Sequence, residues 1–175
     1  MQRHVKMPKT AMPEFNLTRL NFHSPYKIWV ENNEYKFITD YGVSYRIIFS
    51  PNHDIWQNGA YEFSIFNENN KISPNDPKVK DTVEAIIEEF FLTNPDILLY
   101  QCETGDNRQA MRARLFTKWF NEYAGKHKFC VRVSVIHDEE IDNYIALIVQ
   151  TTNPNLNSIL QTFNDFIGFF SQKPE

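Results

Sequence analysis

Two arginines one helical turn apart are the strongest candidates for a binding site in this sequence. Arg108 and Arg112 lie in a segment that is predicted to be helical, and at 100° per residue both point along the same direction as Leu115. A guanidinium group on an apolar stripe must be paired with a carboxylate, with backbone carbonyls or with a bound anion. We therefore expect either a pocket for a small anionic ligand, formed with Asn107, or structural ion pairs to nearby carboxylates.

Cys102 is a second candidate, as a reactive thiol. It stands at the predicted carboxyl end of a strand, where the N-terminus of the following helix could lower a thiol pKa. No histidine lies close to it in the sequence to act as a base, and a single cysteine beside a core strand is more often a small buried apolar residue. Both roles remain open for Cys102.

The sequence predicts no metal site. Its five histidines are dispersed, without the paired spacing that metal ligands show. The segment His137-Asp138-Glu139-Glu140 gathers oxygen ligands, but it lacks the pattern of a calcium loop, and an acidic segment between two apolar runs is typical of a hairpin turn. We interpret it as a turn.

Helices and strands must position these residues, and the chain predicts them clearly after residue 33. Residues 1–13 are predicted to be a flexible arm, residues 14–33 receive no assignment, and residues 14–175 are expected to form one α+β domain. Alternating apolar residues predict strands, and apolar stripes at helical spacing predict helices. The predicted strands are 35–39, 43–49, 60–66, 97–100, 129–136 and 144–151, and the predicted helices are 76–94, 106–125 and 154–170.

The predicted order is β-β-β-α-β-α-β-β-α, which indicates a mixed central sheet with helices on its faces. Asp76 and Pro77 have the residue types of an N-cap and a first helical position. The short, continuously apolar run 97–100 is typical of a strand buried on both faces, and a helix on either side of it favours a parallel crossover.

Composition and charge restrict the function classes. With 175 residues, of which 42% are hydrophobic, the chain can fold around one core. Its net charge of -4 disfavours general binding to nucleic acid. Neither a signal peptide nor an apolar run long enough to cross a membrane is present, and the chain has only two cysteines. We expect a soluble, cytoplasmic protein without a membrane partner.

From residue 34 to residue 151 this order resembles the core of the GNAT-type N-acetyltransferases. Asn107 and Ala110 resemble the Asn-x-x-Ala opening of the helix that follows the central strand in that family. The resemblance implies acetyl-CoA, or another acyl-CoA, as cofactor. It also implies that the turn after the third strand holds the pyrophosphate with glycine-rich backbone at a helix N-terminus.

Two positions depart from the GNAT pattern. Residues 67–76, the corresponding turn, contain no glycine, and Arg114 replaces the tyrosine that often serves as general acid in that family. We therefore expect no cofactor and a non-catalytic binding or interaction module for a small anionic ligand or a protein partner. One alternative is an active N-acyltransferase with an atypical phosphate-binding turn that uses Lys71. Another is a partner-binding protein that uses the N-terminal arm and the first hairpin.

A second resemblance covers residues 102–120. They carry a Cys-x-x-x-Asp-x-Arg-Gln, Arg-x-Arg-x-Phe and Trp-Phe pattern, which is similar to an uncharacterised family of small bacterial proteins. That resemblance implies no known activity.

Overall fold

The computed structural model describes residues 12–94, 96–101, 109–123 and 126–171 as two compact units. We call Met12–Phe49 with Phe63–Pro95 the N-terminal unit, and Ser50–Glu62 with Asp96–Glu175 the C-terminal unit. The boundary between them runs through two neighbouring strands, so each unit holds one end of both.

The described residues form an α+β fold with a mixed, seven-stranded sheet and four α-helices. The strands are hydrogen-bonded in the order β1-β2-β3-β4-β5-β7-β6. The strands are β1 Trp29–Glu31, β2 Glu34–Ile38, β3 Ser44–Asn52, β4 Ala60–Asn67, β5 Leu98–Gln101, β6 Phe129–Asp138 and β7 Ile141–Gln150. The helices are α1 Leu17–His23, α2 Pro77–Thr93, α3 Gln109–Glu122 and α4 Leu156–Ser171, with a 3-10 turn at Lys126–Lys128.

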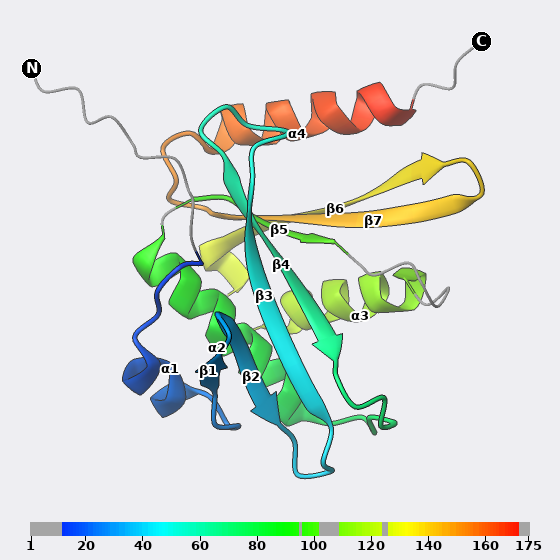
Figure 1. Cartoon of the computed structure of the whole chain (residues 1–175). Helices are drawn as coiled ribbons and strands as arrows, with labels where there is room; N and C mark the ends of the chain where they lie inside the picture. Colours follow the sequence, from blue (N-terminus) through cyan, green and yellow to red (C-terminus); the bar gives the residue numbers. More distant parts are fainter. Residues whose placement is uncertain (1–11, 95, 102–108, 124–125, 172–175) are drawn as a thin grey trace, which may run out of the picture. The chain divides into compact units, whose positions relative to one another are not determined.

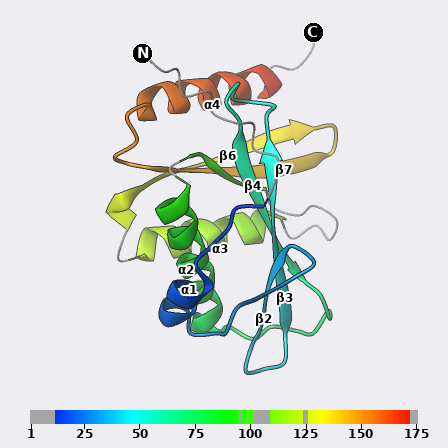
Figure 2. The ribbon, with the colours of Figure 1, turned by 60° about the vertical axis from the view of Figure 1, so that its left-hand side comes forward.

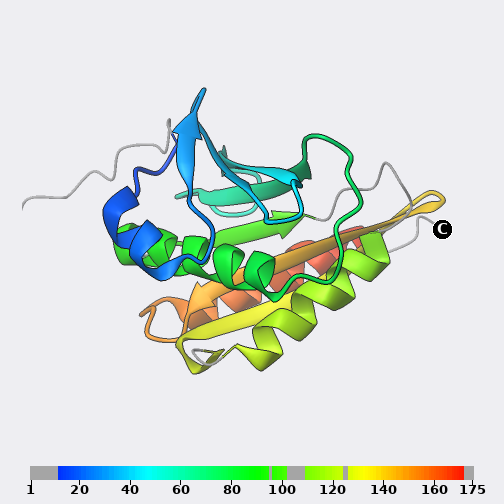
Figure 3. The ribbon, with the colours of Figure 1, turned by 90° about the horizontal axis from the view of Figure 1, so that it is seen from below.

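In the N-terminal unit, helix α2 lies against one face of the first strands (Figure 3). The buried face of β2 carries Tyr35 and Phe37, which are 1% and 0% exposed. Phe49 of β3 stacks on Phe90 of α2, with ring centroids 5.7 Å apart and the planes within 5°. The aromatic residues that alternate along these strands therefore form the core of this unit.

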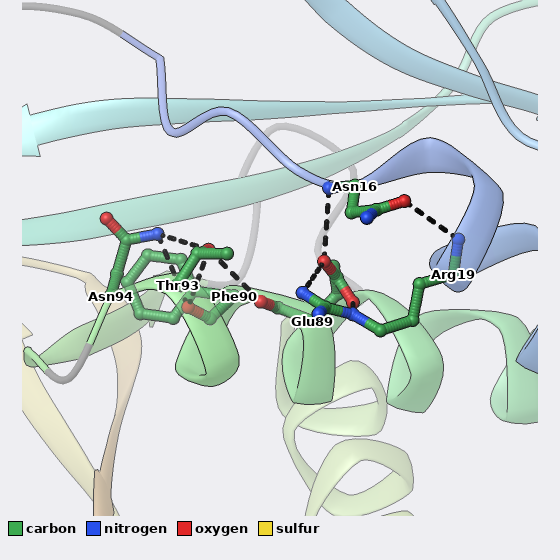
Figure 4. Close-up of polar contacts among 6 residues, drawn as sticks. All are labelled: Asn16, Arg19, Glu89, Phe90, Thr93 and Asn94. Atoms are coloured by element: carbon green, nitrogen blue, oxygen red, sulfur yellow. Dashed lines mark hydrogen bonds and ion pairs between the residues drawn. The ribbon is translucent and has the colours of Figure 1, made fainter.

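Helix α1 lies beside α2 (Figure 2) and is held there by a buried carboxylate. Glu89 of α2 is 3% exposed and accepts hydrogen bonds from Nε and Nη2 of Arg19, at 2.9 and 2.6 Å. It also accepts from the backbone N–H of Asn16, at 3.1 Å, and the Asn16 side chain caps α1 by accepting from the Arg19 N–H (Figure 4). A seven-residue helix is too short to be stable alone, so this network fixes it.

In the C-terminal unit, α3 and α4 lie on opposite faces of β5, β7 and β6 (Figure 1). The face under α4 contains Leu99 and Leu147, which are fully buried with Phe163 of α4. Trp56, from the loop between β3 and β4, completes this core by stacking on Phe163, with centroids 6.3 Å apart. Helix α4 packs on the sheet, as its apolar stripe predicts.

The predicted α+β class and every predicted strand and helix are confirmed, and most differences lie at the ends of elements. The hairpin turn after β6 is shorter than predicted, because both strands continue to the two-residue loop Glu139-Glu140. His137 therefore belongs to β6 and pairs with Asp142 of β7. Pro13, predicted to be part of the flexible arm, is buried, and its carbonyl accepts a hydrogen bond from the Tyr35 hydroxyl at 2.7 Å.

Residues 1–11 of the predicted arm lie outside the described residues. The region 14–33, left unassigned above, contains α1 and β1. Among the helices that are described, none is long and apolar enough to span a bilayer.

Candidate functional site

Only one of the four candidate residues lies in the part of the chain that the structure describes. Arg112 belongs to α3, whereas Cys102, Asn107 and Arg108 lie outside the described residues. The anion pocket and the reactive thiol therefore stay predictions.

The predicted apolar stripe of α3 is wrong on the side of Leu115, along which Arg112 was placed. The residues of α3 that face the sheet are Ala113, Phe116 and Phe120, which are 4%, 3% and 5% exposed. Leu115 is 45% exposed, because it lies about 200° around the helix from Ala113. Arg112 is half-buried on the flank of the packed face. A guanidinium on the flank of a packed face can extend to solvent while its aliphatic part stays packed.

The first turns of α3, which contain Arg112, lie near the carboxyl end of β5. Phe116 stacks on Tyr100 of β5, with centroids 4.5 Å apart. Tyr100 is the second-to-last residue of β5, at the carboxyl end of the strand. Arg112 lies one helical turn before Phe116 on α3. The carboxyl end of a strand beside the first turn of a helix is a common place for anion binding.

A second cluster of polar side chains closes the N-terminus of α2 in the N-terminal unit. Asp76 is the N-cap residue, as predicted, and its Oδ1 accepts a hydrogen bond from the backbone N–H of Lys78 at 3.0 Å. Its Oδ2 accepts a hydrogen bond from the hydroxyl of Tyr26. The carboxylate of Asp76 thus joins α2 to the segment before β1.

Tyr26 is buried at 5% exposure and also accepts a hydrogen bond, from the backbone N–H of Asp40 at 3.2 Å. Burial, followed by the hydrogen bond to Asp76, raises the pKa of Tyr26 to about 12. Lys78 pairs with Asp40 at 2.7 Å, and its ammonium lies 5.5 Å from the centre of the Tyr26 ring. The cluster holds a tyrosine that is neutral at physiological pH between two carboxylates.

The segment between β4 and α2 contains Lys71, which lies close to the turn between β2 and β3. Lys71, the candidate for the atypical phosphate-binding turn, places its Nζ 2.9 Å from the position that a Cβ on Gly42 would occupy. Gly42 lies in the turn between β2 and β3 and has a φ of 74°. Lys71 therefore lies against that turn.

Sequence reasoning identified Asp76 in this cluster but not Tyr26 or Asp40. Tyr26 is 50 residues away from Asp76, and its only local signal is the preceding Pro25, which marks an irregular segment. Among the described residues, no three His, Cys, Asp or Glu side chains are grouped so that they could hold a metal ion.

Residues 75–165 match the model of a family that is described as a family of unknown function, DUF6169. The chain belongs to this family. The matched region begins just before the α2 cap and includes Asp76 and Arg112, whereas Tyr26 and Asp40 lie before it. The prediction of an uncharacterised family is confirmed. No curated protein and no solved structure matches the chain.

Proposed function

We propose that this domain is a non-catalytic binding or interaction module, in which a GNAT-like order of elements does not use acetyl-CoA. The observation that carries this proposal is the closed N-terminus of α2. In the GNAT-type arrangement that the element order resembles, the helix after the third meander strand offers its free N–H groups to the pyrophosphate of the cofactor. In that resemblance, the corresponding helix of this chain is α2, which follows β4.

The first backbone donors of α2 are already used. Pro77 has no N–H to offer. The N–H of Lys78 donates to the side chain of Asp76, and the N–H of Val79 donates to the backbone carbonyl of Asp76 at 3.1 Å. A pyrophosphate could gain these donors only by displacing the cap, which itself stabilises the helix by about 1 kcal/mol.

The charge around this helix end also disfavours an anion. The carboxylates of Asp76 and Asp40 lie beside the ammonium group of Lys78, which Asp40 already pairs. A pyrophosphate placed here would lie close to the Asp76 carboxylate, and like charges at short range repel. The absence of glycine between β4 and α2 adds to this, because the backbone cannot approach a phosphate as closely.

The ligand of such a module is expected to be a small anion or a protein partner. The positive charge for binding a small anion comes from Arg112, on the flank of α3. Arg112 lies in the C-terminal unit, whereas the α2 cap lies in the N-terminal unit. Anion binding at Arg112 is therefore separable from acyl-CoA binding at α2.

A thermal shift experiment tests the proposal. The melting temperature is measured with acetyl-CoA, with ATP and with inorganic pyrophosphate, each at up to millimolar concentration. A ligand at 100 times its Kd stabilises the native state by about 2.7 kcal/mol, which raises the Tm of a protein of this size by roughly 5 to 11 °C. We expect no increase that is specific to acetyl-CoA.

An increase with acetyl-CoA alone contradicts the proposal. Equal increases with all three compounds that disappear in Arg112→Gln support a general anion site on α3. Arg114→Gln, on the same helix, is the matched control.

A further inference from the structure

Strand β6 forms an open edge of the sheet in the C-terminal unit. It is the last strand in the hydrogen-bonded order, and it pairs with β7 over ten consecutive residues without a bulge. No strand among the described residues pairs with its other side. One row of backbone N–H and C=O groups of β6 therefore faces outward.

The register identifies the residues that carry these outward groups. The N–H of Thr151 donates to the carbonyl of Lys128 at 2.9 Å, so this pair, directly before the first pair of the ladder, is hydrogen-bonded. Hydrogen-bonded and non-hydrogen-bonded pairs alternate along an antiparallel ladder. The even-numbered residues of β6 therefore bond to β7. The odd-numbered residues present their N–H and C=O at the open edge, and these are Phe129, Val131, Val133, Val135 and His137.

This edge lacks the features that usually prevent edge-to-edge pairing. Between residues 129 and 136 it has no proline or glycine, and Arg132 is its one charged residue. Val133, at the middle of the edge, is 37% exposed. A long, regular and apolar edge strand is a template for another strand.

Three phenylalanines provide apolar surface on α4, the helix that contacts β6. Phe169 and Phe170 are 72% and 47% exposed, and with Phe166 they form a chain of ring contacts at 4.8 and 5.2 Å. The flank of α4 with Leu160 and Ile167 packs on the core that contains β5 and β7. Phe169 lies about 160° around the helix from Ile167, on the flank of α4 that does not pack on this core.

We infer that this edge and the phenylalanines of α4 form the contact surface for a second copy of this chain, with the two β6 strands antiparallel about a twofold axis at Val133. Only pairings between odd-numbered residues align the outward groups. The register centred on Val133 pairs all five of them, Phe129 with His137, Val131 with Val135 and Val133 with itself. It places Arg132 opposite Ser134.

The neighbouring register, centred on Arg132, would place two guanidinium groups face to face. The chosen register avoids this repulsion. In it, both α4 helices lie on the same face of a continuous sheet, because the twofold axis is perpendicular to the sheet. Phe169 and Phe170 of the two copies then share one side of the interface, and each ring can bury on the order of 100 Å² of its exposed area there.

Sedimentation velocity of the full chain at 1 to 100 µM tests the inference. Wild type is expected to be a dimer at the higher concentrations. Val133→Lys places two ammonium groups at the axis and should yield a monomer, and Phe169→Lys should weaken the dimer at least tenfold. Ile72→Lys, at a side chain that is 94% exposed in the N-terminal unit, is the matched control and should leave the dimer unchanged. Circular dichroism confirms that each variant is folded.

Disulfide cross-linking tests the register. In a background with Cys102→Ser and Cys130→Ser, the double variant Arg132→Cys and Ser134→Cys places cysteines opposite each other in a non-hydrogen-bonded pair, close enough for a disulfide. Oxidation should yield a covalent dimer from the double variant and from neither single variant. A wild-type monomer at 100 µM overturns the inference, and so does a dimer that survives Val133→Lys and Phe169→Lys. A dimer without the cross-link overturns the register.

Discussion

The hydrogen bond between Tyr26 and Asp76 can be measured by a double-mutant cycle with Tyr26→Phe and Asp76→Ser. Phenylalanine keeps the buried ring and removes the hydroxyl. Serine retains the cap, because it also accepts the N–H of Lys78, but its side chain is too short to reach Tyr26. The cycle therefore isolates the contact that joins Tyr26 to the cap of α2.

The structure sets the expected magnitude. A hydrogen bond to a charged acceptor contributes about 1.5–3 kcal/mol when buried, and Asp76 is half-buried, so we expect a coupling energy of about 1–2 kcal/mol. Tyr26→Phe should lower the free energy of unfolding by a similar amount. Asp76→Ser should have little further effect once the hydroxyl is absent.

Urea unfolding at pH 7, followed by circular dichroism, supplies the four free energies, with the m-value as a check on two-state behaviour. Tyr35→Phe, which removes a different buried hydroxyl, is the control variant and should show no coupling to Asp76→Ser. A coupling below about 0.3 kcal/mol in the Tyr26 cycle would refute the hydrogen bond between Tyr26 and Asp76.

Three further predictions concern pH, the α1 contact and the α4 core. Burial raises the pKa of Tyr26 and of Tyr35 from 10 to about 12, so the neutral phenols stabilise the fold below pH 10 and this contribution is lost as pH rises from 10 to 12. Urea unfolding across that range should show the decline, with a smaller slope in Tyr26→Phe. Glu89→Gln removes the charge that pairs with Arg19 and should lower the melting temperature. The control Asp81→Asn, at an exposed position of the same helix, should leave it unchanged. Equal melting temperatures for the two variants would contradict the network that holds α1. Phe163→Ala should lower the free energy of unfolding in urea by about 3–5 kcal/mol, because the Phe163 side chain is 0% exposed. Phe169→Ala should lower it by less than about 0.5 kcal/mol when the protein is monomeric. Similar decreases for the two variants would contradict the placement of α4.

The fold after residue 33 could be predicted because its signals are local. Asp76 and Pro77 mark the start of α2, and the alternation of Tyr35, Phe37 and Ile47 marks strands. The segment before β2 could not be predicted, because α1 buries only Leu20 and depends on Glu89, about 70 residues away. The turn between β1 and β2 had a signal, since Asn32 and Asn33 adopt the positive φ that asparagine tolerates.

The candidate sites show the limit of helical periodicity. Met111 and Leu115 are apolar, so the stripe of α3 was placed too far around the helix, yet both are more than 40% exposed. Periodicity finds an apolar face, but the packing direction depends on the sheet below it, here on Tyr100. Likewise, the sequence predicts the helix cap at Asp76, whereas the hydrogen bond between Asp76 and Tyr26 depends on the folded chain.

Isothermal titration calorimetry of the wild-type protein with acetyl-CoA tests the central claim most directly, because the claim concerns binding at the N-terminus of α2. With Asp76 holding the first donors of that helix, we predict no saturable heat from acetyl-CoA, at concentrations up to 1 mM, beyond that seen with inorganic pyrophosphate. Saturable binding of acetyl-CoA to one site per chain, with a Kd below roughly 100 µM, that pyrophosphate does not reproduce and Arg112→Gln does not remove would contradict the account.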